Sequence, residues 1–176
     1  SAYFPCTRVG DLVFVAGQLA RDATGGIAPE ARGGIARETR YLVERRLQPA
    51  LQAAESGLDL ILKPQVYLSH PADVPAFWQV WTEYFSGKVP PTLVVPLRHP
   101  AFLTAEATIE INVIAAAASA RQRIRDIECE VPALSFDGLL FIARLTDTSM
   151  ANILDKARKI FTAADSTLEN VVRVLQ

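Results

Sequence analysis

An apolar run at Leu12–Gln18, LVFVAGQ, constrains the fold more than any other stretch of this 176-residue chain. It has the length of a strand, is rich in Val, and follows Gly10-Asp11, a pair typical of a tight turn. Residues 2–9 precede the turn and supply the other arm of a predicted hairpin. The run closes on Ala16 and Gly17, small residues that let another group approach the backbone.

A similar sequence pattern occurs again later in the chain. Leu139–Ala143, LLFIA, follows the turn-like pair Asp137-Gly138, so that Phe141 corresponds to Phe14. Two predicted helix endings also match, AAESGLD from Ala53 and AADSTLE from Ala163. We therefore predict a domain at residues 1–118 and an incomplete second copy at 119–176. The second copy is shorter than the first between its hairpin and its helix, either because its loop is trimmed or because residues are missing from it.

The periodicity of apolar residues predicts the helices and strands of each copy. The first unit should contain two helices, about Ile35–Glu55 with a bend at Pro49 and about Val74–Phe85, and three strands, Leu60–Leu68, Thr92–Leu97 and Ala105–Ala115. Pro64 favours an edge position for the first of these strands, or a start after it. The order β-β-α-β-α-β-β predicts an α+β layer, a mixed sheet with two helices on one face. The opposite face is apolar, so another surface should cover it.

The second unit has fewer predicted elements. They are a hairpin of Ile127–Ala133 and Leu139–Leu145, a helix at Ala151–Ala164 and a strand at Asn170–Leu175. Half a layer with an unpaired edge is a poor independent domain. We therefore expect either that the natural polypeptide continues or that another chain completes this half.

Charge and composition exclude several classes of protein. The net charge of −1, with scattered Lys and Arg, gives no field that attracts nucleic acid or an anionic membrane, so neither is an expected partner. No long apolar run of membrane-spanning length is present, and we expect a soluble, cytoplasmic protein. Two cysteines and two histidines form no metal or redox motif, and neither a metal nor a cofactor is expected.

These pieces together resemble the RidA family, also called YjgF or endoribonuclease L-PSP. The resemblance rests on Tyr3, Gly10, the LVFVAGQ run, Ala53-Ala54 with Leu58-Asp59, VYLSHPAD at Val66–Asp73, Tyr84-Phe85, Pro90-Pro91 and IEINVIA at Ile109–Ala115. It covers residues 2–115 fully and 125–176 in part. It implies a chorismate-mutase-like fold, a trimer or pseudo-trimer with the sheets packed inward as a barrel, and a small-molecule ligand in clefts between subunits. Known members hydrolyse enamines and imines.

Residue by residue, the resemblance implies a cleft with altered chemistry. Tyr3 matches the family's tyrosine, and Ala16-Gly17-Gln18 matches its Ser-Gly-Gln without the hydroxyl. Thr92 stands where the family has a carboxylate-binding arginine, Val94 where it has a cysteine, and Asn112 where it has the acid. An amide orients water but does not take its proton. The catalytic residues therefore stay unassigned, although these family positions fall on Thr92 and Asn112.

Other residues offer replacements and have plainer explanations. Arg98 and His99 supply a substitute cation or simply a solvated strand end. Glu110 is either a displaced catalytic acid or a surface or barrel residue. Alternation along the strand places it on the same face as Asn112. Trp78 and Trp81 fit a helix core better than a stacking platform.

Three functional hypotheses follow. The first is a diverged imine or enamine deaminase, a hydrolase. The second is a binding or assembly module without chemistry. The third is a piece of a diphthine-ammonia-ligase-like protein, whose tandem RidA-like domains the two copies resemble. An endoribonuclease activity is not supported, because the sequence predicts neither a basic groove nor a histidine pair placed for RNA cleavage.

Overall fold

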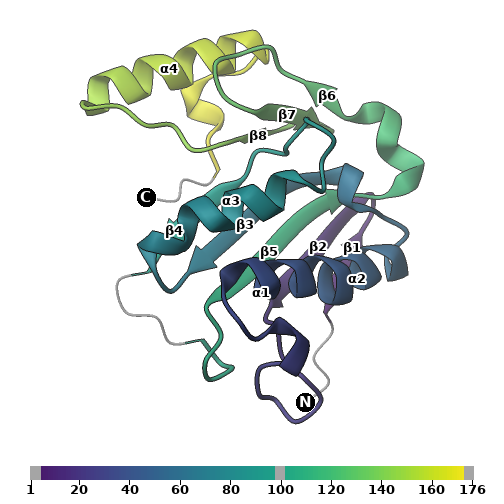
Figure 1. Cartoon of the computed structure of the whole chain (residues 1–176). Helices are drawn as coiled ribbons and strands as arrows, with labels where there is room; N and C mark the ends of the chain where they lie inside the picture. The colour runs from purple at the N-terminus through teal and green to yellow at the C-terminus, as the bar shows by residue number, and fades with distance from the viewer. Residues whose placement is uncertain (1–4, 98–101, 173–176) are drawn as a thin grey trace.

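The computed structural model describes residues 5–97 and 102–172 and contains two β-sheets (Figure 1). The larger sheet has the strand order β1-β2-β5-β3-β4. Its strands are β1 (Cys6–Val9), β2 (Leu12–Gln18), β3 (Ile61–Leu68), β4 (Leu93–Pro96) and β5 (Ile109–Ala116). Only β3 and β4 run parallel; the other neighbours are antiparallel. The predicted α+β fold with a mixed sheet is confirmed.

One face of this sheet is covered by helices (Figure 1). The first helix consists of α1 (Ile35–Tyr41), a π-helical turn (Leu42–Leu47) and α2 (Gln48–Ala53). Within it the Gln48 N–H bonds to the Val43 carbonyl, five residues back. The wider turn directly precedes Pro49, which has no N–H to continue the regular α-helical pattern. Helix α3 (Val74–Thr82) lies beside it on the same face.

The main core lies between these helices and the sheet. Strand β5 alternates as predicted, with Ile109, Ile111 and Val113 buried and Glu110 and Asn112 on the opposite side. The helices contribute large buried side chains to the core: Leu42, Leu47, Phe77 and Trp81. Trp81 is fully buried, which confirms its interpretation as helix core. We call the sheet face away from these helices the outer face.

The prediction for the strand containing Pro64 was wrong. Strand β3 runs through Pro64 and lies between β5 and β4, rather than at an edge or after the proline. Pro64 pairs with Val113 of β5, while pairing with β4 begins only at Gln65. The proline is therefore tolerated because β3 has only one neighbour at that position.

The second sheet contains β6 (Arg125–Asp126), β7 (Ala133–Phe136) and β8 (Leu139–Ile142), followed by α4 (Met150–Ala163). The first arm of this hairpin is therefore Ala133–Phe136, and the predicted arm at Ile127–Ala133 was wrong. Both turn residues, Asp137 and Gly138, have positive φ, 49° and 78°, as a two-residue hairpin of type I′ requires. Of the predicted strand Asn170–Leu175, residues 173–175 lie outside the described residues, and Asn170 ends a 3-10 turn, Leu168–Asn170.

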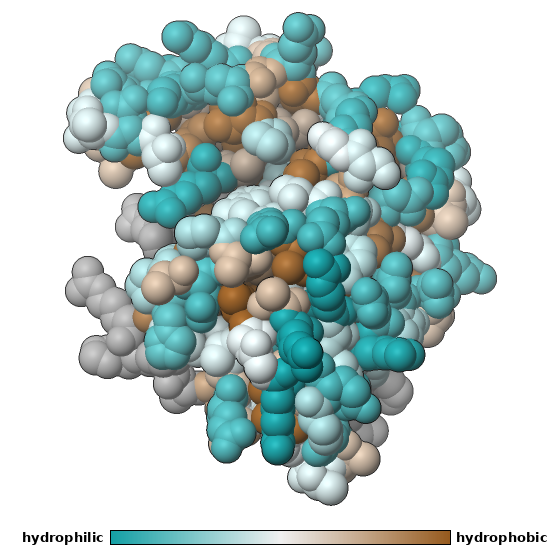
Figure 2. Space-filling model, in the orientation of Figure 1, coloured by the Kyte–Doolittle hydropathy of each residue, from teal (hydrophilic) through white to brown (hydrophobic). Residues whose placement is uncertain are grey.

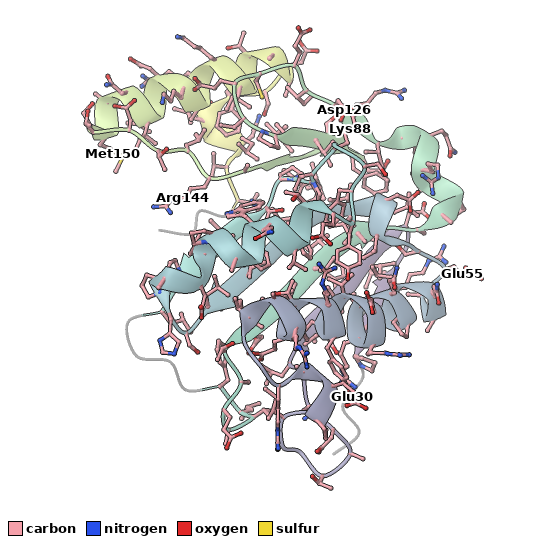
Figure 3. All side chains as sticks on the ribbon, in the orientation of Figure 1. Glu30, Glu55, Lys88, Asp126, Arg144 and Met150 are labelled. Carbon is pink, nitrogen blue, oxygen red and sulfur yellow. The ribbon has the colours of Figure 1, made fainter. Side chains whose placement is uncertain are left out.

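The second sheet covers one end of the outer face. Leu62 of β3 and Ala116 of β5 share a buried cluster with Phe136 of β7. Arg123 pairs with Asp11 and Asp137, which lie in the two hairpin turns. Lys88 and Asp126 form a further ion pair between the parts (Figure 3). The predicted covering of the outer face is thus provided in part by the same chain.

Candidate functional site

Three polar or small residues gather on the outer face of the large sheet. Gly17 lies at an irregularity of β2, where pairing with β5 shifts between Val15 and Gln18. An added Cβ at Gly17 would lie 2.7 Å from Glu110 Cδ and 3.1 Å from Asn112 Oδ1. The Glu110 carboxyl and the Asn112 amide thus occupy the space that a side chain at position 17 would need. This confirms the close approach that the closing glycine of LVFVAGQ predicts.

Glu110 is the ionisable group of this cluster. The side chain is half-buried, and burial raises the pKa of its carboxyl above the usual range. A raised carboxyl pKa brings the group closer to the range in which it both accepts and donates protons near neutral pH. Tyr67 of β3 lies directly opposite Glu110, and Gln65 opposite Asn112. Tyr67 was not singled out from the sequence, although its alternation with Gln65 places both on this face.

Thr92 and Val94 lie on the other side of the sheet. The Thr92 hydroxyl accepts a hydrogen bond from Trp81 Nε1 (3.1 Å) and donates one to the Pro90 carbonyl (2.9 Å). Thr92 is 4% exposed, and Val94 belongs to the core beneath the helices. The structure therefore does not bring these two positions together with Gly17, Glu110 and Asn112.

The remaining predicted cleft residues have different outcomes. Tyr3, Arg98 and His99 lie outside the described residues. Ala16 is half-buried on β2, and its carbonyl accepts a hydrogen bond of 2.8 Å from Gln18 Nε2. This bond fixes the Gln18 amide beside the irregular part of β2, next to Gly17.

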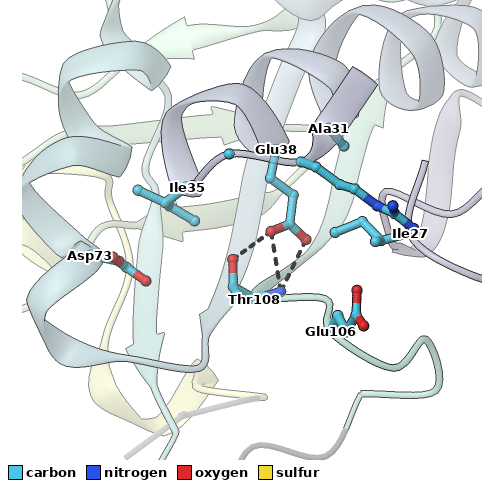
Figure 4. A pocket seen from close by; sticks show the side chains of 10 residues that line it. Ile27, Ala31, Ile35, Glu38, Asp73, Glu106 and Thr108 are labelled. Carbon is cyan, nitrogen blue, oxygen red and sulfur yellow. Dashed lines mark hydrogen bonds between the residues drawn. The ribbon is translucent and has the colours of Figure 1, made fainter. Parts of the chain in front are cut away.

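A separate cavity of about 370 Å³ lies at the beginning of α1 (Figure 4). Its buried charged residue is Glu38, whose carboxylate accepts hydrogen bonds from the Thr108 N–H (3.0 Å) and hydroxyl (2.5 Å). Burial raises the pKa of Glu38, while the bonds from Thr108 oppose that rise. Glu38 thereby holds the residue that precedes β5 against the helix. The sequence gives no signal for this pair, because its members are 70 residues apart.

Within the described part of the chain, no group of three His, Cys, Asp or Glu residues is placed to hold a metal ion. No described helix is long and apolar enough to span a bilayer.

Comparison with known proteins identifies the family. The sequence model for the endoribonuclease L-PSP family matches residues 1–117, which include Gly17, Glu110 and Asn112. The chain belongs to this family, the RidA/YjgF family. A RutC family protein of Saccharolobus solfataricus is 32% identical over 113 residues, which are 64% of this chain and 85% of that protein.

Solved structures show the same RidA/YjgF fold. A putative endoribonuclease from Thermotoga maritima is 26% identical with a TM-score of 0.57, covering 66% of this chain and 87% of that one. RidA from an Antarctic Psychrobacter is 21% identical with a TM-score of 0.55, covering 66% and 89%, and shows likeness of fold alone. The family match ends at residue 117, so β6–β8 and α4 lie beyond it.

Proposed function

We propose that this RidA/YjgF protein binds a small imine or carbonyl metabolite on its outer face and hydrolyses imines there slowly. The observation that carries the proposal is the Glu110 carboxyl, half-buried beside Gly17 and Asn112. In this position Glu110 serves as the acid that this chain lacks at position 112, where the family pattern has one. The site therefore has a proton-transferring group, displaced by two residues along the same face of β5.

Imine hydrolysis makes defined demands on such a site. Water adds to the carbon of the C=N bond and one of its protons moves to the nitrogen, which gives a carbinolamine. The hydroxyl proton of the carbinolamine then moves to the amine, the C–N bond breaks, and ammonia leaves as the carbonyl forms. Glu110 takes the proton from water and returns it to nitrogen, while the Asn112 amide orients the water. The site binds a substrate carboxylate only weakly, because Thr92 replaces the family's arginine and its hydroxyl is hydrogen-bonded inside the core. The rate should therefore fall below that of a site with a guanidinium anchor.

Replacing Glu110 by glutamine tests this assignment. We expect hydrolysis of enzymatically generated 2-aminoacrylate to fall about 10²–10⁴-fold, the usual contribution of general acid–base catalysis. In the parent protein the rate should rise with pH through the raised pKa of Glu110, and this limb should vanish in Glu110→Gln. Glu30→Gln, at an exposed carboxylate elsewhere (Figure 3), is the matched control. An unchanged rate and pH profile in Glu110→Gln would remove Glu110 from the mechanism.

We further propose that the outer face is closed by oligomerisation, as a trimer or pseudo-trimer of layers. Phe14 of β2 is 40% exposed and Val9 of β1 is 63% exposed, although Leu12 of β2 packs against the cluster around Phe136. Apolar side chains in such a position favour a contact with another layer. Sedimentation at micromolar concentration should give a mass above that of one chain, and Phe14→Asp should lower it. A monomeric parent protein would contradict this prediction.

A further inference from the structure

Two helices in this chain end with the same hydrogen bonds. The Ser56 N–H bonds to the Leu51 carbonyl (2.8 Å), and the Ser166 N–H bonds to the Phe161 carbonyl (2.7 Å). Each serine is preceded by a non-glycine residue in the left-handed region, Glu55 (φ 55°) and Asp165 (φ 50°). A 3-10 turn follows in both places, at Leu58–Leu60 and Leu168–Asn170. Every element of this ending recurs in the second copy at the same spacing from the others.

The two hairpins also correspond. Strand β7 matches β1, and β8 matches the first four residues of β2, with two-residue turns in both. Each ladder continues with the same kind of bond beyond the paired strands, from the Ala16 N–H to the Pro5 carbonyl (3.0 Å) and from the Ala143 N–H to the Pro132 carbonyl (2.9 Å). Antiparallel bonding alternates along a strand, so Leu140 and Ile142 direct their backbone groups away from β7.

The equivalent backbone groups of the first unit are paired with β5. Val13 and Val15 of β2 lie opposite Ala115 and Val113 of β5, which in turn pairs with β3 on its other side. Among the described residues β8 ends its sheet, and its outer edge is thus the edge that β5 occupies in the complete layer. The polar contact that β3 makes with this edge comes from Lys63 Nζ, which donates to the Ile142 carbonyl (2.5 Å). Lys63 belongs to β3 of the large sheet, and its side chain satisfies a carbonyl that a strand paired at this edge would otherwise bind.

Side chains around this edge are less buried than their counterparts. Val171 and Val172 are 37% and 91% exposed, while the matching Ile61 and Leu62 are 3% and 0% exposed. Ile153 and Phe161 of α4 are half-buried, whereas the matching Val43 and Leu51 are fully buried. Figure 2 shows hydrophobic residues on the underside of α4, in the hollow between the two parts of the molecule. Apolar surface is thus left open on the helix, on the edge and at Val171-Val172 together.

We infer that residues 125–172 form the opening half of a second RidA-type layer, whose β8 edge binds an antiparallel strand of the β5 type. The occupant is an extended segment that alternates aliphatic and polar residues, as β5 itself does. It would pair with Leu140 and Ile142, take over the carbonyl that Lys63 now contacts, and cover the apolar side of α4. The inference is independent of the proposed chemistry, because no residue of the outer-face site takes part in it.

A synthetic peptide of Thr108–Ala116, TIEINVIAA, is the probe, with binding to the full chain followed by fluorescence anisotropy. Two N-methylated versions are matched in size and hydrophobicity. Methyl groups on Val113 and Ala115 block the edge that faces β2 in the first layer, and methyl groups on Asn112 and Ile114 block the opposite edge. We expect the first pair to weaken binding at least about tenfold, since two backbone hydrogen bonds are lost, and the second pair to weaken it less.

Hydrogen exchange locates the bound peptide without altering the protein. The amides of Leu140 and Ile142 should become protected on addition of the unmethylated peptide and stay unprotected with the Val113/Ala115-methylated one. The inference is overturned if the peptide does not bind, if both methylated peptides bind equally, or if protection appears only elsewhere. It is also overturned if two copies of the chain pair through β8 and the peptide does not compete.

Discussion

Replacing Gly17 by alanine is expected to abolish function at the outer face while leaving the fold in place. The new Cβ would lie 2.7 Å from Glu110 Cδ, closer than real Cβ atoms approach other groups, so the carboxyl must turn away. Hydrolysis of 2-aminoacrylate should then fall about 10²–10⁴-fold, as in Glu110→Gln, because the proton-transferring group is displaced. Parallel rate and thermal-unfolding measurements separate this loss from a loss of stability.

Two further variants sharpen the interpretation of that result. Gly26→Ala is the matched control, because its added Cβ meets nothing closer than 3.9 Å. In a Gly17→Ala/Glu110→Ala double variant the clash is removed, so any decrease in the free energy of unfolding caused by Gly17→Ala should be reversed while hydrolysis stays low. Parental activity in the Gly17→Ala variant would show that the reaction occurs elsewhere on the molecule.

Local patterns in the sequence predicted most of the first layer. The alternation along Ile109–Ala115 identified which residues face the core, and the Gly10-Asp11 turn identified the hairpin. These features are local, because side-chain direction alternates along a strand and short turns determine their own pairing. For the same reason the second hairpin was recognised from its turn. Its first arm was misplaced because Ile127–Ala133 is also apolar in part.

The candidate site was only partly predictable. The family resemblance placed Gly17 and Asn112 in one cleft, and alternation placed Glu110 on the same face as Asn112. No sequence pattern indicated that the Glu110 carboxyl lies directly against Gly17. That contact depends on the shift of pairing between β2 and β5, which is a tertiary feature. The orientation of Thr92 could likewise not be predicted from the sequence. The family resemblance gives its position along the chain, whereas the face it occupies depends on the partner it finds at Trp81.

The orientation of Thr92 also explains why two losses in the family pattern are unequal. Asn112 lies on the outer face, so Asn112→Glu would return a carboxylate beside Gly17. Position 92 lies in the core, where the hydroxyl satisfies both the Trp81 indole and the Pro90 carbonyl. Restoring the acid is therefore a local change, while restoring the cation requires a different local backbone.

Thr92→Arg is accordingly expected to unfold the protein rather than to create an anchor for carboxylates. A guanidinium at a position that is 4% exposed would be buried without a described carboxylate partner, which typically costs more than about 4 kcal/mol. Thr92→Val is the control that keeps the size of the side chain and removes the hydroxyl. It removes the two hydrogen bonds, leaves Trp81 Nε1 unpaired and should lower the free energy of unfolding by about 1–3 kcal/mol. Urea unfolding of the three proteins measures both costs. A folded Thr92→Arg protein of parental stability that binds pyruvate more tightly would show that position 92 can reach the ligand.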